Sequence, residues 1–196
     1  MEPVHLTTER LELRAFTADD TEDLCAAYQD PVIQRWTPAL PIPYERDHAA
    51  DFIGLTVPNG WRDDTSYAFC VRPRGGGPLI GSAGLHHPRE GGWEIGYWTA
   101  AEHRGRGYAT ETALALARWA FTELGCVRLE WRAEVGNAAS LAVAEKAGFT
   151  VEGVVRAGMQ SRGTVRDSLV ASLLPSDLGL APPVPYVPAP AVRGSV

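Results

Sequence analysis

Apolar and polar residues alternate in several short stretches of this chain, as is typical of half-buried β-strands. Near the N-terminus, Leu11, Leu13 and Ala15 alternate with Glu12 and Arg14, which predicts a first strand. Turns rich in glycine and proline separate three later stretches, so these are expected to form an antiparallel meander. The predicted strands after the first cover residues 66–72, 79–86, 92–99, 127–133, 149–160 and 165–174.

Apolar residues recur every three to four positions between these strands, which predicts helices. The strongest helix covers residues 107–124 and ends at Gly125; the others cover residues 18–29, 44–55 and 137–147. The turn signal Pro58-Asn59-Gly60 is expected to follow the end of the second helix. The order β-α-α-β-β-β-α-β-α-β-β predicts one α/β domain with a mixed, mostly antiparallel, twisted sheet of about seven strands and four helices.

A chain of 196 residues has the length of about one domain, which we assign to residues 1–175. The composition changes near Pro175. From Ala181 onward the sequence holds several prolines and almost no charge. Such a composition cannot bury enough apolar surface to order itself, so residues 176–196 are expected to be a Pro-rich, disordered tail.

Charge and cysteine usage narrow the function classes. The formal net charge is −6, whereas general nucleic-acid binders are more often basic, so a nucleic-acid partner is disfavoured. No apolar run is long enough for a membrane span, and no signal peptide is visible. Cys25, Cys70 and Cys126 are widely spaced and odd in number. This favours reduced thiols and a cytoplasmic location over a disulfide framework, and no metal site is expected.

The first motif with chemical meaning joins a strand to the strongest helix at residues 103–110, His-Arg-Gly-Arg-Gly-Tyr-Ala-Thr. Glycines let the backbone approach a ligand closely, and the free N–H groups of a first helical turn attract an anion. Arg104 and Arg106 add positive charge. The segment therefore predicts a pyrophosphate cradle, although a plain glycine-rich helix start would look the same.

Two further motifs flank this segment. Asn137-Ala138-Ala139-Ser140 begins the last helix, where Asn137 would also serve as an ordinary N-cap. The strand Trp93-Glu94-Ile95-Gly96-Tyr97-Trp98 contains a glycine, which suggests a bulge or a close backbone approach. Its three aromatic residues could equally belong to the core.

In this order and spacing, the motifs resemble the GNAT superfamily of N-acetyltransferases, specifically its RimJ/RimL-type branch of ribosomal-protein N-terminal acetyltransferases. The resemblance covers residues 6–174. It rests on the cradle, on the segment from Asn137 to Phe149, on the opening strand at residues 8–14, and on the Glu-Ile-Gly-Tyr-Trp strand at 94–98.

The resemblance implies a GNAT fold with acetyl-CoA as co-substrate and no metal. The strands at residues 96–99 and 127–133 would diverge, and the pantetheine arm would lie between them. The residues it assigns to acetyl-CoA are Tyr97, Trp98, Thr99, Arg104, Gly105, Arg106, Gly107, Tyr108, Ala109, Thr110, Asn137, Ser140 and Lys146.

The resemblance also suggests how an amine would attack the thioester. Many GNAT proteins protonate the leaving thiolate with a tyrosine at the position occupied here by Ala144, and we assign that role to Ser140 instead. A backbone N–H in a bulge at Tyr97-Trp98 would stabilise the oxyanion. RimL-like proteins can carry a glutamate at the position where this chain has Met159. Because that glutamate is missing here, Glu94 and His86 are the candidates for the general base.

The acceptor is predicted to be the α-amine of a protein or peptide. Acetylation of a small amine such as an amino acid, polyamine or antibiotic is an alternative, and a non-catalytic acyl-CoA-binding module is another. By resemblance, Trp36, Tyr44 and the first two helices would line the acceptor groove. A homodimer is also compatible with this interpretation.

Overall fold

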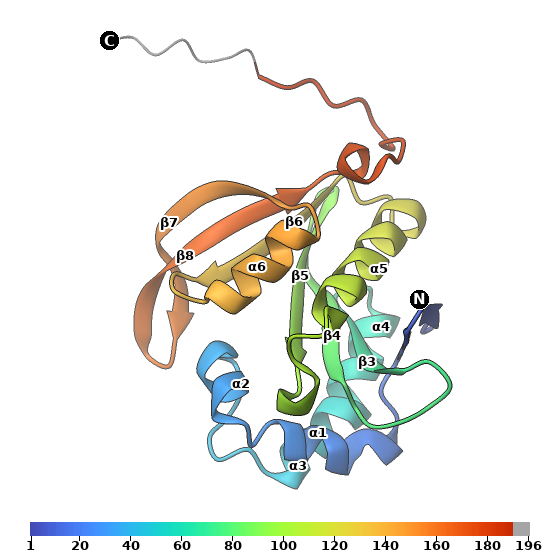
Figure 1. Cartoon of the computed structure of the whole chain (residues 1–196), viewed down its shortest axis with the longest axis vertical. Coiled ribbons are helices and arrows are strands. Elements are labelled where there is room, and N and C mark those ends of the chain that lie inside the picture. Colours follow the sequence, from blue (N-terminus) through green and yellow to red (C-terminus); the bar gives the residue numbers. More distant parts are fainter. Residues whose placement is uncertain (190–196) are drawn as a thin grey trace.

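One sheet organises the molecule. The computed structural model describes residues 1–189, apart from the side chains of residues 87–89, and forms eight strands in the order β1-β2-β3-β4-β5-β6-β8-β7 (Figure 1). Neighbouring strands are antiparallel except β5 and β6, which are parallel. The strands are β1 (Leu6–Thr7), β2 (Leu11–Arg14), β3 (Tyr67–Pro73), β4 (Gly81–Arg89), β5 (Gly92–Thr99), β6 (Arg128–Glu134), β7 (Thr150–Ser161) and β8 (Thr164–Leu173).

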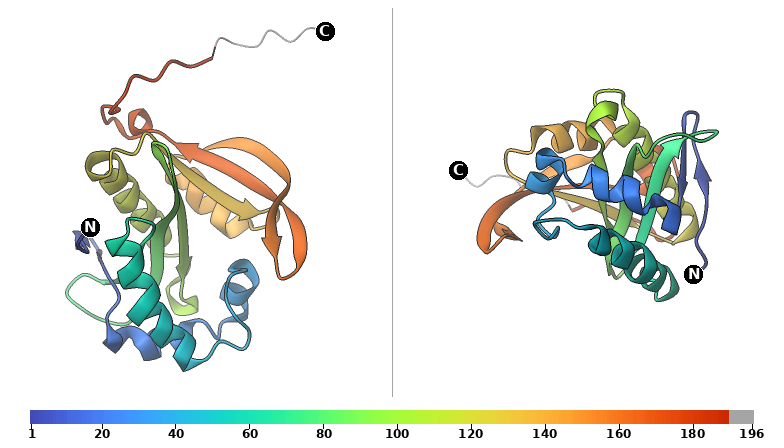
Figure 2. Two further views of the ribbon diagram at one scale, coloured as in Figure 1. Left: turned by 180° about the vertical axis from the view of Figure 1, so that it is seen from behind. Right: turned by 90° about the horizontal axis from the view of Figure 1, so that it is seen from below.

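Helices cover the sheet from both sides (Figure 2). On one face, α5 packs beside α6 and against β4 and β5, and its Trp119 meets the buried ring of Phe69. On the other face, α1 brings Tyr28 against Trp98 of β5 and packs beside α3. The helices are α1 (Thr21–Ala27), α2 (Pro31–Trp36), α3 (Arg46–Asp51), α4 (Val57–Arg62), α5 (Tyr108–Glu123) and α6 (Ala138–Lys146).

The parallel pair is where the sheet opens. β5 and β6 are paired from Gly92 and Arg128 only as far as Ile95 and Trp131. Beyond that point β5 continues beside β4, while β6 continues beside β8. The two strands therefore diverge toward their carboxyl ends, as the resemblance implied (Figure 1).

The α/β class and the mixed, mostly antiparallel sheet are confirmed, but the element counts and one helix boundary are corrected. The short strand β1 makes eight strands rather than seven, and α2 occupies a segment expected to be a loop. The second predicted helix continues through Pro58 to Arg62, by way of a π-helical turn at Phe52–Thr56.

Packing explains why the expected turn at Pro58-Asn59-Gly60 does not form. Pro58 stands within one continuous helical segment, directly after the π-helical turn, because Thr56 and Val57 already have right-handed helical angles. A Cβ on Gly60 would lie 2.2 Å from Ser66 Oγ, so this glycine allows the next segment to cross closely. The glycine therefore serves a tertiary contact rather than a turn.

A buried carboxylate fastens α1 to the sheet. Asp20, at the start of α1, is fully buried and accepts two hydrogen bonds from Arg14 and two from Arg72. The Thr17 amide also donates to it, at 2.7 Å. Burial alone would raise the pKa of this carboxyl, but the hydrogen bonds outweigh burial and hold the pKa well below its usual range.

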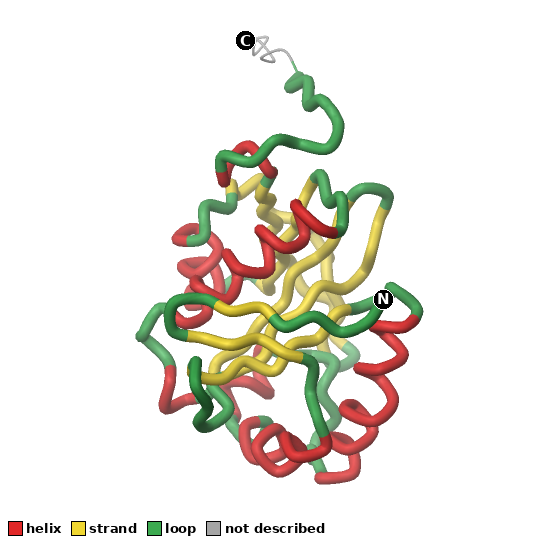
Figure 3. Tube along the Cα trace, turned by 90° about the vertical axis from the view of Figure 1, so that its right-hand side faces the viewer, coloured by secondary structure: helices red, strands yellow, loops and turns green. Residues whose placement is uncertain are grey.

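The chain leaves the domain after β8. A 3₁₀ turn at Pro175–Leu178 follows, and Leu178 and Leu180 still pack against the core. Residues 181–189 are exposed, have no helix or strand, and extend away from the domain (Figure 3). The boundary at residue 175 and the disordered tail stay predictions, and residues 190–196 of that tail lie outside the described residues.

Two absences hold for the described residues alone. No helix among them is long and apolar enough to cross a membrane. Within the same part of the chain, no group of three His, Cys, Asp or Glu side chains is arranged to hold a metal ion.

Candidate active site

The loop before α5 has the backbone geometry of an anion cradle. Gly105 and Gly107 have φ angles of 74° and 78°, a left-handed conformation that favours glycine. No atom lies within 4 Å of where a Cβ on Gly105 would be, so the space beside it is open. Within the described chain, the amides of residues 105–107 donate to no protein acceptor. These groups and the first turn of α5 are thus available to an anionic ligand.

A clamp from the first hairpin holds this cradle in place. Arg10 donates to Glu111 Oε2 through Nε at 2.6 Å and to the Arg106 carbonyl through Nη1 at 3.0 Å. Its guanidinium also lies 4.8 Å from the centroid of the Tyr108 ring. Thr8 donates to Glu111 Oε1 at 2.5 Å. One side chain therefore contacts residues on both sides of Gly107.

The other charged residues assigned to acetyl-CoA differ in their surroundings. Arg104 donates to the Asp30 carboxylate at 2.5 Å and to the Thr99 carbonyl at 3.0 Å, so its charge is partly used within the protein. Arg106 and Lys146 are exposed. Lys146 lines an open groove together with residues 8–10, Gly107 and Thr110.

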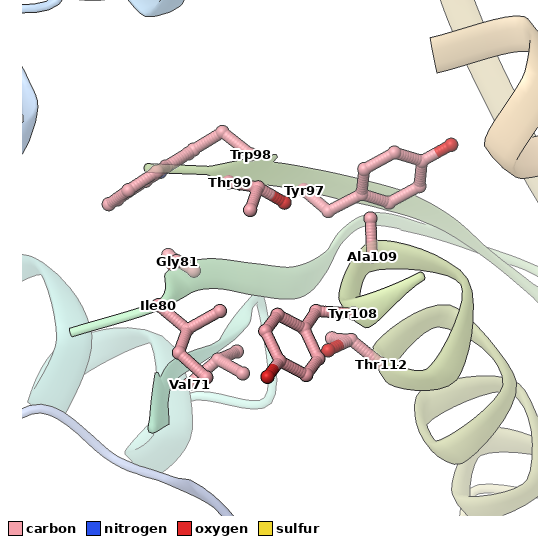
Figure 4. Close-up of a pocket in the computed structure, with 10 residues that line it drawn as sticks. Val71, Ile80, Gly81, Tyr97, Trp98, Thr99, Tyr108, Ala109 and Thr112 are labelled. Carbon is pink, nitrogen blue, oxygen red and sulfur yellow. The ribbon is translucent and has the colours of Figure 1, made fainter. Parts of the chain in front are cut away.

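Strand β5 and the start of α5 meet at a small cavity. Tyr97, Trp98 and Thr99 line it from the strand, and Tyr108 and Ala109 line it from the helix (Figure 4). In this view Tyr97 lies next to Ala109, with its hydroxyl directed away from the other labelled side chains. The structure thus brings the cradle and the β5 residues together.

Ser140 lies at the centre of a hydrogen-bonded cluster that spans the diverging strands. Trp131 of β6 donates to Ser140 Oγ through Nε1 at 3.1 Å, and Ser140 Oγ is 3.4 Å from the hydroxyl of Tyr97 on β5. The Tyr97 hydroxyl donates to the Ser140 carbonyl at 3.1 Å. Asn137 caps α6 by accepting from the Ser140 amide at 3.2 Å.

Glu94 lies on the opposite face of β5 from Tyr97, because side chains alternate along a strand. Its carboxylate is 3.5 Å from His86 Nε2, and the two residues are paired across β4 and β5. The His86 ring covers Gly96, where a Cβ would lie 2.8 Å from the ring. Gly96 therefore makes room for His86.

The expected bulge at Tyr97-Trp98 is wrong. The register between β4 and β5 is regular from Gly81 and Thr99 to His86 and Glu94, and it shifts only between His86 and Arg89. An oxyanion donor on Tyr97 or Trp98 would therefore have to come from a regular strand whose far edge is left unpaired by the divergence from β6.

Aromatic residues gather on the side of β5 that faces α1. Trp98 donates to the Tyr28 hydroxyl at 3.0 Å, and the Tyr28 ring meets Tyr44 edge to face. Burial raises the pKa of Tyr28 to about 12.

Three arginines hold α2 near this aromatic group. Arg104 bonds Asp30 at the N-cap of α2, and Arg162 donates to the Gln34 carbonyl. Arg35 forms two bonds to Glu134 of β6, and its guanidinium lies over the ring of Trp36. Contacts from the cradle loop, from the β7–β8 turn and from β6 thus converge on one short helix.

The sequence pattern does not reveal the clamp from Arg10 or the contacts of Tyr97 and Trp131 with Ser140. Arg10 lies about a hundred positions from the cradle it holds. In each of these contacts the two residues lie on different helices, strands or loops, so no local sequence pattern predicts the contact. Only the pairing of the strands, together with α5 and α6, brings them together.

Comparison with known proteins agrees with this geometry. A model of the acetyltransferase (GNAT) domain matches residues 10–150. The chain is 28% identical over 174 residues to "Uncharacterized N-acetyltransferase p20" of Bacillus licheniformis, covering 86% of this chain and 95% of that protein. It is 40% identical over 100 residues to "Putative ribosomal N-acetyltransferase YdaF" of Bacillus subtilis, covering 50% and 55% of the two chains.

A solved structure gives the same result. The "putative ribosomal-protein-serine acetyltransferase from Vibrio cholerae" superposes with a TM-score of 0.77 at 26% identity, covering 88% of this chain and 98% of that one. The matched domain spans the cradle, the diverging strands and Ser140. This protein therefore belongs to the GNAT acetyltransferase family.

Proposed function

We propose that this GNAT acetyltransferase transfers the acetyl group of acetyl-CoA to the α-amine of a protein or peptide by direct attack. The observation that carries the proposal is the opening between β5 and β6, with the cradle at one end and Ser140 beside it. A thioester lying in that opening would meet hydroxyl donors from two elements. The names of the Bacillus subtilis and Vibrio cholerae relatives, which refer to ribosomal proteins, support a protein acceptor.

The residues fit the co-substrate that the family uses. The free amides of residues 105–107 and the start of α5 would bind the pyrophosphate, helped by Arg106. Lys146 would approach the adenosine end from the groove it lines. Asn137 and the backbone of residues 97–99 would face the pantetheine arm. Arg104 would have to share its charge with Asp30.

Ser140 and Glu94 would act on the two protons of the reaction. Ser140 Oγ already accepts a hydrogen bond from Trp131, and its own proton is engaged only in the long 3.4 Å contact with the Tyr97 hydroxyl, from which it could turn toward a sulfur atom. Glu94 would accept the proton that the amine loses, with His86 holding the carboxylate in place. Because Ser140 and Glu94 lie on opposite faces of β5, the thiol would leave on one face and the amine would enter from the other.

The magnitudes favour an α-amine. Its unperturbed pKa is about 7.7–8.0, so roughly a fifth is neutral near pH 7.3 without help from the enzyme. A lysine amine has a pKa near 10.4, and deprotonating it there costs about 4 kcal/mol. An α-amine therefore needs less help from a general base such as Glu94 than a lysine amine does.

The test is the release of CoA with matched acceptors. One peptide is offered with a free α-amine, and the same peptide with a blocked N-terminus and one internal lysine is the control; a polyamine and a free amino acid complete the set. We expect release with the free α-amine and little with the blocked peptide. Equal rates with the blocked peptide, or a strong preference for a small amine, would refute the acceptor class. Binding of acetyl-CoA without release to any amine would indicate a binding module.

A further inference from the structure

The hydroxyl of Tyr97 lies beside Ser140 where β5 and β6 diverge. Tyr97 lies on β5 two residues beyond Ile95, the last residue paired with β6, and Trp131 is the last paired residue on β6. The two side chains therefore stand at opposite edges of the opening. Both contact Ser140. The Tyr97 hydroxyl is 3.4 Å from Ser140 Oγ, and Trp131 Nε1 is 3.1 Å from the same atom.

From this arrangement we infer that Tyr97 is a second catalytic hydroxyl, which donates a hydrogen bond to the departing sulfur together with Ser140. The inference rests on the proposed acetyl transfer. The N–C bond forms, the C–S bond breaks, and its electron pair goes to sulfur. The proton that reaches sulfur comes through the hydroxyl pair and is replaced from solvent, while the amine proton leaves to the base.

The present hydrogen bonds leave the Tyr97 proton easy to redirect. The Tyr97 hydroxyl donates to the Ser140 carbonyl at 3.1 Å. That carbonyl lies in the first half of α6, where a backbone amide four residues later donates to it as well. If the Tyr97 hydroxyl turned toward a ligand, the carbonyl would keep its helical partner. No buried acceptor would be left unsatisfied, so the reorientation costs little.

The state of the phenol also fits a donor. Burial raises the pKa of Tyr97 to about 12, although hydrogen bonds with Ser140 and Trp131 act in the opposite direction. At neutral pH the phenol therefore keeps its proton. A group that is always protonated can donate in every catalytic cycle, and its ring is fixed between β5 and the start of α5 (Figure 4).

Trp131 orients the Ser140 hydroxyl. Its indole N–H can only donate, and it is directed at Ser140 Oγ. This fixes one lone pair of the serine and orients the serine proton toward Tyr97 or a ligand. Trp131 is 2% exposed, so its orientation is set by the core. We therefore regard Trp131 as a positioning residue.

The experiment compares Tyr97→Phe with Tyr67→Phe, which removes a phenol hydroxyl that donates to Asp64 in another part of the molecule. Each variant is assayed with the best amine found for the wild type, and acetyl-CoA affinity and melting temperature are measured in parallel. We expect Tyr97→Phe to lower kcat about 10- to 100-fold, at the weak end for general-acid groups, while its Kd for acetyl-CoA stays within about twofold. Tyr67→Phe should leave kcat unchanged.

A double variant adds a second criterion. If Tyr97 and Ser140 act as one unit, Tyr97→Phe combined with Ser140→Ala should lose little more activity than the worse single variant. An unchanged kcat in Tyr97→Phe, with a reduced kcat in Ser140→Ala, would overturn the role of Tyr97 and leave the acetyl transfer standing. A wild type that releases no CoA with any amine would refute the transfer itself.

Fluorotyrosine at position 97 keeps the test open if Tyr97→Phe does not fold. It keeps the shape of the ring and makes the hydroxyl more acidic. A donor to the sulfur should then raise kcat at neutral pH, without a change in acetyl-CoA affinity. A hydroxyl with a purely structural role would move neither quantity, and that result would overturn the inference.

Discussion

Asp20 offers the sharpest test of the packing, because one substitution should change both the stability of the protein and its dependence on pH. In Asp20→Asn, an amide NH₂ replaces one carboxylate oxygen and faces the donors of Arg14, Arg72 and the Thr17 amide. Breaking a buried ion pair costs roughly 3–5 kcal/mol, and the partly exposed arginines place the loss near 3 kcal/mol. For this chain length, that corresponds to roughly 6–12 °C in melting temperature.

The pH dependence has a definite sign. The pKa of Asp20 is lowered in the folded protein, so its contribution to stability is complete above the unfolded pKa, about 3.9, and is lost as pH falls through and below that value. Melting is therefore followed by circular dichroism from pH 7 to pH 3. The wild type should lose stability in acid more steeply than Asp20→Asn. The control is Asp19→Asn, since Asp19 is an exposed neighbour.

An Asp20→Asn variant that melts within about 2 °C of the wild type and keeps its acid slope would refute this account of the network. The consequence would reach the site, because α1 carries the Tyr28 hydroxyl that accepts from Trp98. A loosened α1 should therefore also weaken acceptor binding.

Three further predictions concern acetyl-CoA. Acetyl-CoA at about a hundred times its Kd should stabilise the protein by roughly 2.7 kcal/mol, which corresponds to a rise in melting temperature on the order of 5–10 °C. A chelator should not change this rise, and the absence of any rise would contradict acetyl-CoA as co-substrate. Gly107→Val should weaken acetyl-CoA binding by titration calorimetry in a folded protein, because the left-handed conformation and the close backbone approach both exclude a side chain; unchanged affinity would remove the cradle. Arg10→Gln should raise the KM for acetyl-CoA about tenfold with a smaller effect on kcat, because the cradle loses its clamp to Glu111. The control is Arg118→Gln, because Arg118 is an exposed arginine on α5, the helix that carries Glu111. An equal effect of that substitution would contradict the clamp.

Local patterns predicted most of the fold. Strand β5 was predicted with its observed bounds and α5 to within a residue, because alternation and helical spacing are local properties. Pro58 and Gly60 were misinterpreted because the contact that explains Gly60 is with Ser66, and no pattern within the helix records that contact. In the same way, Gly96 was expected to mark a bulge or a close backbone approach, but the group that lies against it is the side-chain ring of His86 on the neighbouring strand.

The candidate site was predictable to the same depth. Glycines before a helix and an asparagine at a helix start are sequence signals with a physical cause, so the left-handed Gly107 before α5 and the Asn137 cap of α6 could be predicted. The partners of Ser140 could not, because Tyr97 and Trp131 meet only through the parallel register of β5 and β6. Charge pairing was equally hidden, since Arg104 reaches Asp30 across the fold.

The short helix α2 gives the molecule an uneven response to ionic strength. Ile33 is the one buried residue among the six of α2. The charged contacts of the helix are made by Arg104 and Arg35, whose side chains are 36% and 48% exposed. Mobile ions weaken exposed pairs of this kind, whereas they hardly affect an apolar core. Concentrated salt should therefore weaken the hold on α2 more than the packing of α5 and α6, whose buried side chains belong to the core.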